Sequence, residues 1–402
     1  MPVGSASARA GFDALPTDAV AEALPRLSRR TALLGAAALL APLAPRFAAA
    51  APAPAPVAAN PPTHAVPGPI RLDSNENPYG PSPAARRAIL ASAVEAPRYA
   101  DAAIEELISA LADYQQMDRS QIVVGSGSAE LLNMAAMLAA EAGPGGELIA
   151  AQPTFEQLPA FAANVGVQTN WVPLDAGHAH DLAAMHAAIT PRTRLIYVCN
   201  PNNPTATAVR RDALDAFVRS VPATTLVLVD EAYIDLADAD GVGSVATLTR
   251  DCPNLIVLRT FSKIHGLAGL RIGYGMAQPA LAARLRNIQL AFPNVAGLRA
   301  AIASLGDHGF ITATRRALLT DRTRIESALD RLGCAHTRSQ GNFVFFDVSM
   351  PVTTFRSTML ERGVRVGRPF QRYDQWARVT VGTHAEVDRF LELLPAALGR
   401  TA

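Results

Sequence analysis

The sequence predicts an α/β protein in which helices flank a mostly parallel sheet and a smaller α+β domain follows. Three observations predict this class. From Ile122 onward, short apolar runs alternate with amphipathic helical stretches, as strands and crossover helices do in a parallel sheet. Runs such as "LVLVD" are apolar at nearly every position, which is typical of a strand covered on both faces. After about Pro293, longer helical stretches precede a second set of strand-like runs.

The composition allows a large buried core and argues against several classes of protein. Half of the 402 residues are hydrophobic, which excludes disorder of the whole chain. The formal charge is +1, with 36 basic and 35 acidic residues, so no basic face for nucleic acid is expected. Cys199, Cys252 and Cys334 are widely spaced without a CxxC pair. Buried thiols are therefore favoured over a zinc site or a disulfide framework.

The amino end differs in composition from the rest of the chain. Arg29 and Arg30 precede an apolar stretch at 32–41 and small residues that suit an A-x-A cleavage site. Residues 1–50 therefore predict a twin-arginine export signal and a periplasmic or otherwise exported protein; the alternative is an alanine-rich tail on a cytoplasmic protein. Two prolines interrupt the apolar run, so no stable membrane span is expected. Residues 51–67 are interpreted as a Pro/Ala linker.

Strands and helices alternate through the middle of the chain. The apolar runs are "QIVVG", "ELIAAQP", "RLIYVCNPNNP", "TLVLVDEAY" and "NLIVLRTFSK". The helices between them include "SAELLNMAAMLAAEAG" and "RDALDAFVRSV". Each run ends in a polar turn, and ligands collect at the carboxyl ends of strands in open parallel sheets. Functional residues are therefore expected in these turns.

The last third of the chain has a different pattern of predicted helices and strands. Helices are expected over 297–305 and 310–332, followed by the strand-like runs "NFVFFDV", "GVRVGRP" and "ARVTVGT". A final helix, "AEVDRFLELLPAAL", closes this part. The mixture predicts the smaller α+β domain.

Polar residues stand directly at the ends of the predicted strands. Asp230 ends "LVLVD", where a carboxylate is costly unless it has a cationic or proton-donating partner; an N-cap or a structural ion pair is the alternative. Asn203 follows another strand. Ser128 and Ala129 stand at a glycine turn that opens a helix, and exposed helical N–H groups there can bind an anion.

Lys263 lies in the turn after "RTFSK", where a lysine is most often a solvated charge. A lysine whose basicity is depressed by burial near cationic groups can instead act as an amine nucleophile, most commonly in Schiff-base chemistry. Thr260, Ser262, Arg271 and the amides of the glycine turn would donate to one dianionic phosphate. Asp230 would face a protonated ring nitrogen. Together these residues predict a pyridoxal phosphate pocket.

The chain contains, in order, the motifs "NENPYGP", "RYAD", "GSGSAELL", "PTF", "NPNNPT", "DEAY", "SKIHGLAGLRIGY" and "ARVTVGT". This series resembles the fold type I (class I/II) pyridoxal phosphate aminotransferases, most closely the histidinol-phosphate aminotransferase branch, over about Pro69 to Leu398. The resemblance implies a seven-stranded sheet in a cofactor-binding large domain at 98–305. It also implies an N-terminal arm at 68–97 that contributes to a small C-terminal domain at 306–402.

The resemblance assigns a role to each residue of the pocket. Lys263 would bind the cofactor aldehyde and later shuttle a proton, and Asp230 would keep the pyridine nitrogen protonated. Asn203 and Tyr233 would hydrogen-bond the phenolic oxygen, and Phe155 would stack on the ring.

Tyr99 in "RYAD" resembles a tyrosine that reaches the phosphate of the partner subunit's cofactor. This role implies a homodimer with shared active sites. A surface tyrosine at a helix start is the alternative.

The substrate residues are also implied by the resemblance. Arg378 corresponds to the arginine that clamps the substrate α-carboxylate. Tyr79 and Asn342 should line the substrate end of the site. Either Arg365 or Arg368 could be the arginine that histidinol-phosphate enzymes use for the substrate phosphate, because an additional glycine beside Arg368 shifts the motif.

The leading functional hypothesis is an aminotransferase that moves an amino group to a 2-oxo acid such as 2-oxoglutarate. The expected donor is histidinol phosphate or an aromatic amino acid. A decarboxylase or cyclase of the same fold is an alternative, although a firmly held carboxylate is poorly placed to leave. An exported, non-catalytic pyridoxal phosphate-binding protein is the alternative from another class.

Overall fold

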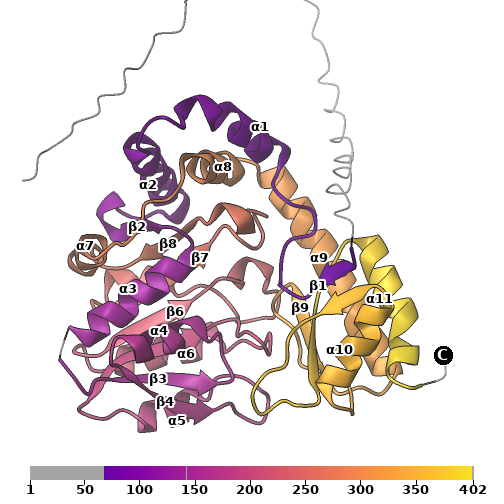
Figure 1. Cartoon of the computed structure of the whole chain (residues 1–402). Coiled ribbons are helices and arrows are strands. Elements are labelled where there is room, and N and C mark those ends of the chain that lie inside the picture. Colours follow the sequence, from indigo (N-terminus) through magenta and orange to yellow (C-terminus); the bar gives the residue numbers. More distant parts are fainter. Residues whose placement is uncertain (1–67, 142, 401–402) are drawn as a thin grey trace, which may run out of the picture. The chain divides into compact units, whose positions relative to one another are not determined.

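The computed structural model describes residues 68–141 and 143–400 of the chain (Figure 1). The predicted export signal (1–50) and Pro/Ala linker (51–67) lie outside the described residues. The strands are β1 (Ile70–Leu72), β2 (Ile122–Gly125), β3 (Glu147–Gln152), β4 (Gln168–Pro173), β5 (Thr193–Cys199), β6 (Leu226–Asp230), β7 (Leu255–Thr260), β8 (Gly273–Met276), β9 (Phe343–Asp347), β10 (Val364–Val366) and β11 (Trp376–Thr380). The α-helices are α1 (Pro83–Ala91), α2 (Asp101–Gln115), α3 (Ser128–Ala140), α4 (Gln157–Asn164), α5 (Leu182–Ala187), α6 (Arg211–Ser220), α7 (Pro279–Asn287), α8 (Val295–Leu305), α9 (His308–Arg331), α10 (Val352–Glu361) and α11 (His384–Ala397).

The main sheet has seven strands in the order β2-β8-β7-β6-β5-β3-β4. The pairs from β4 through β7 are parallel, and β8 runs antiparallel to both of its neighbours. The predicted α/β class with a mostly parallel seven-stranded sheet is therefore confirmed. The parallel arrangement brings the carboxyl ends of β5, β6 and β7 to one edge of the sheet, where the predicted site residues lie.

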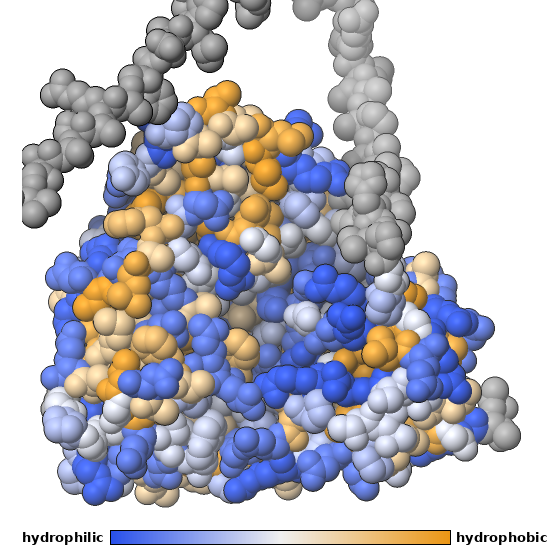
Figure 2. Space-filling model, in the orientation of Figure 1, coloured by the Kyte–Doolittle hydropathy of each residue, from blue (hydrophilic) through white to orange (hydrophobic). Residues whose placement is uncertain are grey.

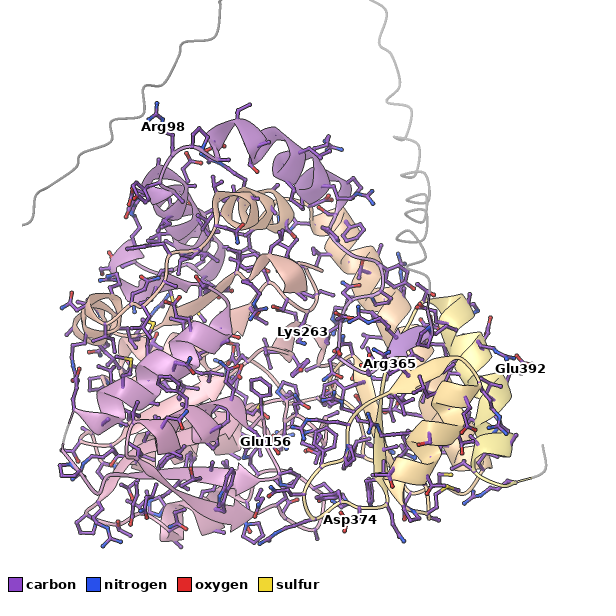
Figure 3. The ribbon with its side chains drawn as sticks, viewed as in Figure 1. Arg98, Glu156, Lys263, Arg365, Asp374 and Glu392 are labelled. Atoms are coloured by element: carbon purple, nitrogen blue, oxygen red, sulfur yellow. The ribbon has the colours of Figure 1, made fainter. Side chains whose placement is uncertain are left out.

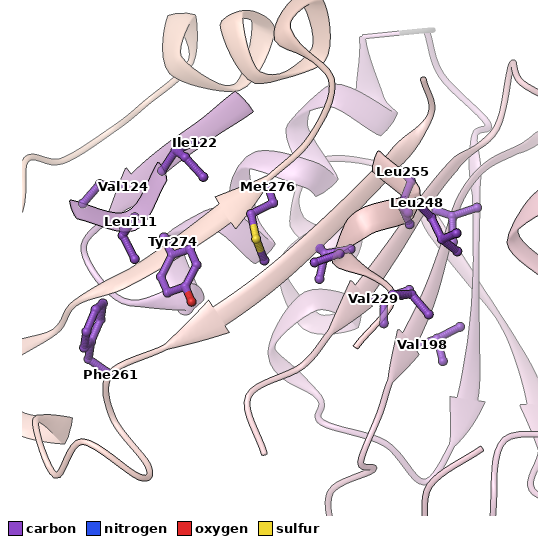
Figure 4. Close-up of a cluster of buried hydrophobic side chains, with 14 of the residues drawn as sticks. Leu111, Ile122, Val124, Val198, Val229, Leu248, Leu255, Phe261, Tyr274 and Met276 are labelled. Atoms are coloured by element: carbon purple, nitrogen blue, oxygen red, sulfur yellow. The ribbon is translucent and has the colours of Figure 1, made fainter. Parts of the chain in front are cut away.

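Alternate residues of each central strand pack on opposite faces of this sheet, as the period of a strand requires. In β5, Ile196 and Val198 join one hydrophobic cluster, which includes side chains of α2, α6 and α8. Figure 4 shows part of this cluster, with Val198 and Leu111 of α2 labelled. Leu195 and Tyr197 join another, which includes side chains of α3, α4 and α7. Because helices cover both faces, β5 is apolar at nearly every position.

A separate hydrophobic cluster lies in the carboxyl-terminal part of the chain. It is built from α9, α10 and α11 together with β9, β10 and β11, and it includes Leu72 of β1. β1 pairs in parallel with β10, and β9 pairs antiparallel with β11. The described residues belong to one compact unit, so the domain limits given above stay predictions. No helix of the described residues is long and apolar enough to cross a bilayer.

Candidate active site

A cavity of about 350 Å³ lies at the carboxyl ends of β5, β6 and β7 and at the start of α3. Figure 3 shows Lys263 between the main sheet and the carboxyl-terminal part of the chain. The predicted residues that line the cavity are Ser128, Ala129, Phe155, Asn203, Asp230, Tyr233, Thr260, Ser262, Lys263, Arg271, Arg368 and Arg378. The structure thus brings together most of the residues that the sequence singled out; their roles stay predictions.

Lys263, the only lysine in the 402 residues, is partly buried in the turn that follows β7. Its Nζ donates a hydrogen bond to the backbone oxygen of Asn75 at 3.0 Å and lies 5.2 Å from the centroid of the Tyr233 ring. Burial, helped by the nearby guanidinium of Arg378, lowers the pKa of Lys263 to about 8, although nearby carboxylates oppose the shift. About one amine in ten is then neutral at pH 7, and the neutral form is the one that attacks an aldehyde.

Asp230 is the last residue of β6 and is only 3% exposed. Tyr197 donates its hydroxyl to Oδ2 at 3.2 Å, and the backbone N–H of Ala232 donates to Oδ1 at 3.1 Å. Burial raises the pKa of Asp230 to about 6, while these two hydrogen bonds and the charge of Lys263 oppose the rise. The carboxyl group is therefore mostly ionised at neutral pH and can hold a proton on a ring nitrogen opposite it.

The start of α3 is crowded in a way that only glycine allows. Gly127 has φ 81°, and a Cβ added to it would lie 2.6 Å from Nη2 of Arg271. A Cβ added to Gly273 would lie 2.2 Å from the backbone nitrogen of Ser128. These two glycines let the Arg271 guanidinium and strand β8 approach the first turn of the helix. No side chain of the described residues caps α3, so its amino end keeps the character of an anion site.

Two hydroxyl groups complete this cradle. Thr260 ends β7, and its Oγ1 donates to Oγ of Ser262 at 2.9 Å. Both residues are buried and line the cavity beside Arg271. Helix amides, hydroxyls and a guanidinium are the donors that a phosphate dianion takes, and Lys263 and Asp230 lie in the same cavity. This chain's residues therefore fit pyridoxal phosphate.

Arg378 of β11 is a buried cation, 8% exposed. Nη1 donates to Oδ1 of Asn203 at 2.6 Å, and Nη2 donates to the backbone oxygen of Asp73 at 2.7 Å. Nε has no hydrogen-bond partner within the described ranges. Burial lowers the pKa of Arg378 to about 10, so the guanidinium stays charged at neutral pH. A buried cation held by neutral oxygens suits an incoming carboxylate.

The structure distinguishes Arg365 from Arg368, the two candidates for the substrate-phosphate arginine, by their position relative to the cavity. Arg368 lies in the loop between β10 and β11, lines the cavity and donates from Nη2 to Oε2 of Glu156 at 2.6 Å. Arg365 is an exposed residue of β10 that does not line the cavity. A Cβ added to Gly367 would lie 2.8 Å from the backbone oxygen of Arg378, so the additional glycine lets this loop run against β11.

Besides Arg365, three predicted residues do not line this cavity. Tyr79 is partly buried against the carboxyl-terminal cluster. Asn342 is 1% exposed and donates from Nδ2 to the backbone oxygens of Asn75 and Glu76, so it supports the segment that holds Lys263. Tyr99 is 96% exposed before α2. The substrate contacts of Tyr79 and Asn342 and the phosphate contact of Tyr99 stay predictions.

Asn75 is a site residue that the sequence analysis missed. Its φ of 54° lies in the left-handed region, which asparagine tolerates better than most residues. Its backbone oxygen accepts from Lys263, its N–H donates to Oγ1 of Thr380, and its Nδ2 donates to the Tyr233 hydroxyl at 3.1 Å. Asn75 therefore connects the lysine to β11 and to the edge of the main sheet.

Tyr197 was also missed, because it lies inside an apolar run that predicts only a core strand. The signal was available: a buried tyrosine hydroxyl usually finds a hydrogen-bond partner, and this one finds Asp230.

A family-wide profile described as "Aminotransferase class I and II" matches residues 67–394. The aromatic amino acid aminotransferase of Rhodococcus jostii is 42% identical over 81% of this chain and 89% of its own length. The histidinol-phosphate aminotransferase of Moorella thermoacetica is 39% identical over 81% of this chain and 84% of its own length. The crystal structure of histidinol-phosphate aminotransferase from Sinorhizobium meliloti in complex with pyridoxal-5'-phosphate superposes with a TM-score of 0.77 at 29% identity, covering 83% of this chain and 91% of that one.

Proposed function

This chain belongs to the class I and II aminotransferases, and its activity is pyridoxal phosphate-dependent transamination. We propose that it moves the amino group of an aromatic amino acid to a 2-oxo acid such as 2-oxoglutarate. The observation that carries this proposal is the placement of Arg378 and Lys263 in one cavity. An amino acid held by its α-carboxylate at Arg378 presents its amino group and α-carbon to the lysine side of the cavity.

Arg368, at the cavity wall, favours a substrate with an uncharged aromatic side chain. Arg368 is already paired with Glu156, so a neutral ring beside it leaves no bare charge. Phe155 adds an aromatic surface to the lining. The name of the Rhodococcus jostii relative, an aromatic amino acid aminotransferase, supports this choice.

Pyridoxal phosphate, when bound, supplies an aldehyde that accepts the amino group and a ring that withdraws electrons from the substrate α-carbon. The N–H groups of Ser128 and Ala129, with Thr260, Ser262 and Arg271, would hold the phosphate. Asp230 would keep a proton on the ring nitrogen, and Asn203 and Tyr233 would hydrogen-bond the ring hydroxyl. Lys263 lines the same cavity as these residues.

Lys263 transfers the proton in this proposal. Its Nζ, with a pKa lowered to about 8, would take a proton from the substrate α-carbon and deliver it to the carbon that belongs to the cofactor's aldehyde group. In the cofactor-free chain, Nζ donates a hydrogen bond to the backbone oxygen of Asn75. Arg378 keeps the carboxylate fixed during this transfer, which positions the α-carbon and opposes loss of carbon dioxide.

An amino-donor screen tests the proposal. Purified protein loaded with cofactor is mixed with each amino acid in turn, and the visible absorbance of the bound aldehyde form is followed. Phenylalanine or tyrosine should bleach this absorbance, and 2-oxoglutarate should restore it. Failure of every aromatic amino acid to bleach it, with another amino acid active, would overturn the aromatic assignment.

Histidinol phosphate is a second candidate donor, favoured by Arg368 at the cavity wall. Its phosphate stands where an amino acid has its carboxylate, so two arginines, Arg378 and Arg368, could share the larger charge. The same screen with histidinol phosphate decides between the donors through the ratio of kcat/KM. A ratio that favours histidinol phosphate at least tenfold would replace the aromatic assignment.

We also propose a homodimer with shared sites. Tyr99 is exposed, and exposed apolar side chains gather nearby in sequence on α1 and η1 (Ser92–Glu95): Leu90 is 77% and Val94 is 83% exposed. Figure 2 shows apolar surface at the end of the molecule formed by α1 and α2. Mixing inactive Lys263→Ala and weakened Tyr99→Ala chains should restore about a quarter of wild-type activity if each site takes Lys263 from one subunit and Tyr99 from the other.

Export through the twin-arginine signal is a further part of this proposal, supported by Arg29, Arg30 and the small residues after the apolar stretch. Fractionation of cells that express the full chain tests it. Replacing both arginines by lysine should move the protein from the exported fraction to the cytoplasm. Equal distribution of both forms would contradict the signal.

A further inference from the structure

An ion pair closes one wall of the active-site cavity. Arg368 Nη2 and Glu156 Oε2 are 2.6 Å apart, and their side chains are 51% and 43% exposed. Arg368 lines the cavity, while Glu156 lines an adjoining cavity of about 460 Å³. Glu156 is the residue before α4, and both of its neighbours in sequence, Phe155 and Gln157, line the active-site cavity.

Arg368 is held near Arg378 by an aromatic ring. The guanidinium carbons of Arg368 and Arg378 lie 4.6 and 5.1 Å from the centroid of the Phe370 ring. The charge of Arg368 is close enough to contribute to lowering the pKa of Arg378, after the larger effect of burial. A second contact, from Nε2 of Gln152 to Oε1 of Gln371 at 3.0 Å, joins the same loop to the end of β3.

We propose that Glu156 is a specificity-determining residue, which competes with the distal anion of an acidic substrate for Arg368 and so sets the balance between acidic and aromatic substrates. The inference rests on the proposed function, in which one cavity must accept an aromatic donor and a dicarboxylic acceptor in turn. With an aromatic substrate, Glu156 keeps Arg368 neutralised. With a dicarboxylate, the distal carboxylate replaces Glu156.

Because the Arg368–Glu156 ion pair is exposed to solvent, replacing Glu156 by a substrate carboxylate costs little free energy. An ion pair in contact with water is stabilised only weakly, so Glu156 can leave Arg368 without a large penalty, and water solvates the carboxylate that is released. Arg378 is different, because it is buried and its guanidinium is held by Asn203 and Asp73. The α-carboxylate subsite is therefore fixed, and the distal subsite is adjustable.

Binding of two unreactive acids to the cofactor-loaded enzyme tests the proposal by calorimetry. Glutarate carries two carboxylates at the spacing of 2-oxoglutarate, and 3-phenylpropionate carries one carboxylate and a ring. Glu156→Gln should tighten glutarate about fivefold, the upper end for an exposed ion pair, and change 3-phenylpropionate less than about twofold. Arg368→Gln should weaken glutarate at least tenfold, and the gain from Glu156→Gln should vanish in the double variant.

Glu141→Gln is the matched control, because Glu141 forms an exposed ion pair with Arg284 on α7, with side chains 49% and 53% exposed. It should change neither affinity. The proposal is overturned if Glu156→Gln shifts both acids alike or neither, if its gain persists without Arg368, or if wild type binds neither acid. The donor screen is scored separately: bleaching by phenylalanine with no effect of Glu156→Gln refutes this inference alone, whereas no bleaching refutes the aromatic assignment.

Discussion

Replacing Lys263 by methionine is expected to stabilise the cofactor-free protein at neutral pH. The pKa of Lys263 falls from 10.5 to about 8 on folding, which at about 1.4 kcal/mol per unit makes the buried charge cost about 3.4 kcal/mol. Methionine has a similar length and no charge. The Asn75 oxygen keeps its hydrogen bond from Asn342, so the substitution leaves no buried acceptor unpaired.

The sign of the pH dependence follows from the depressed pKa. Between pH 8 and 10.5 the unfolded chain binds more protons than the folded one, so the stability of the wild type rises with pH in this window. The advantage of Lys263→Met should therefore be complete below pH 8 and fall to less than half by about pH 9.5. Other titrating groups are common to both proteins and cancel in the difference.

Thermal unfolding of the two cofactor-free proteins measures this effect. A chain of this size has an entropy of unfolding of about 0.7 kcal/mol per kelvin, so about 3.4 kcal/mol raises Tm by roughly 5 °C at pH 7. The reasoning is refuted if wild type is at least as stable as Lys263→Met at pH 7, or if the difference in Tm is the same at pH 9.5.

Two further predictions concern the contacts around the cofactor. Gly127→Ala should weaken cofactor binding about tenfold, measured by fluorescence titration, because the new Cβ meets the Arg271 guanidinium at 2.6 Å; Gly145→Ala has the same φ of 81° but open space, and should leave the affinity unchanged. Tyr197→Phe removes a hydrogen bond that favours the ionised form of Asp230, so the acid limb of kcat/KM should move to higher pH by about half a unit to one unit; an unmoved limb would contradict the role given to this hydroxyl.

The sequence was enough to group the candidate residues that stand at strand ends. Asp230 ends β6, and Asn203 and Lys263 lie just after β5 and β7. Parallel strands bring their carboxyl ends to one edge, so spacing along the chain was enough to group these residues. Ser128 was accessible in the same way, because a glycine turn opens its helix. The apolar runs also predicted these central strands, although the sequence does not say which strand pairs with which.

The contacts that depend on distant pairings could not be predicted. β1 pairs with β10, almost three hundred residues later, and no local pattern of apolar residues records such a partner. The hydrogen bonds of Asn75 to Thr380 and Tyr233 likewise join residues that are more than a hundred positions apart in the sequence. Glu156 was missed for a related reason, since its partner Arg368 is 212 residues away and a glutamate before a helix is ordinary.

That Lys263 is the only lysine gives this protein a built-in reporter. Protein grown with nitrogen-15 lysine contains a single labelled side-chain amine, so its resonance needs no assignment. Every change in that signal, whether from titration, from added vitamin or from an inhibitor, describes one atom in the interior of the catalytic cavity. Arginine supplies the other fixed positive charges on the side chains, and a guanidinium stays silent in such an experiment.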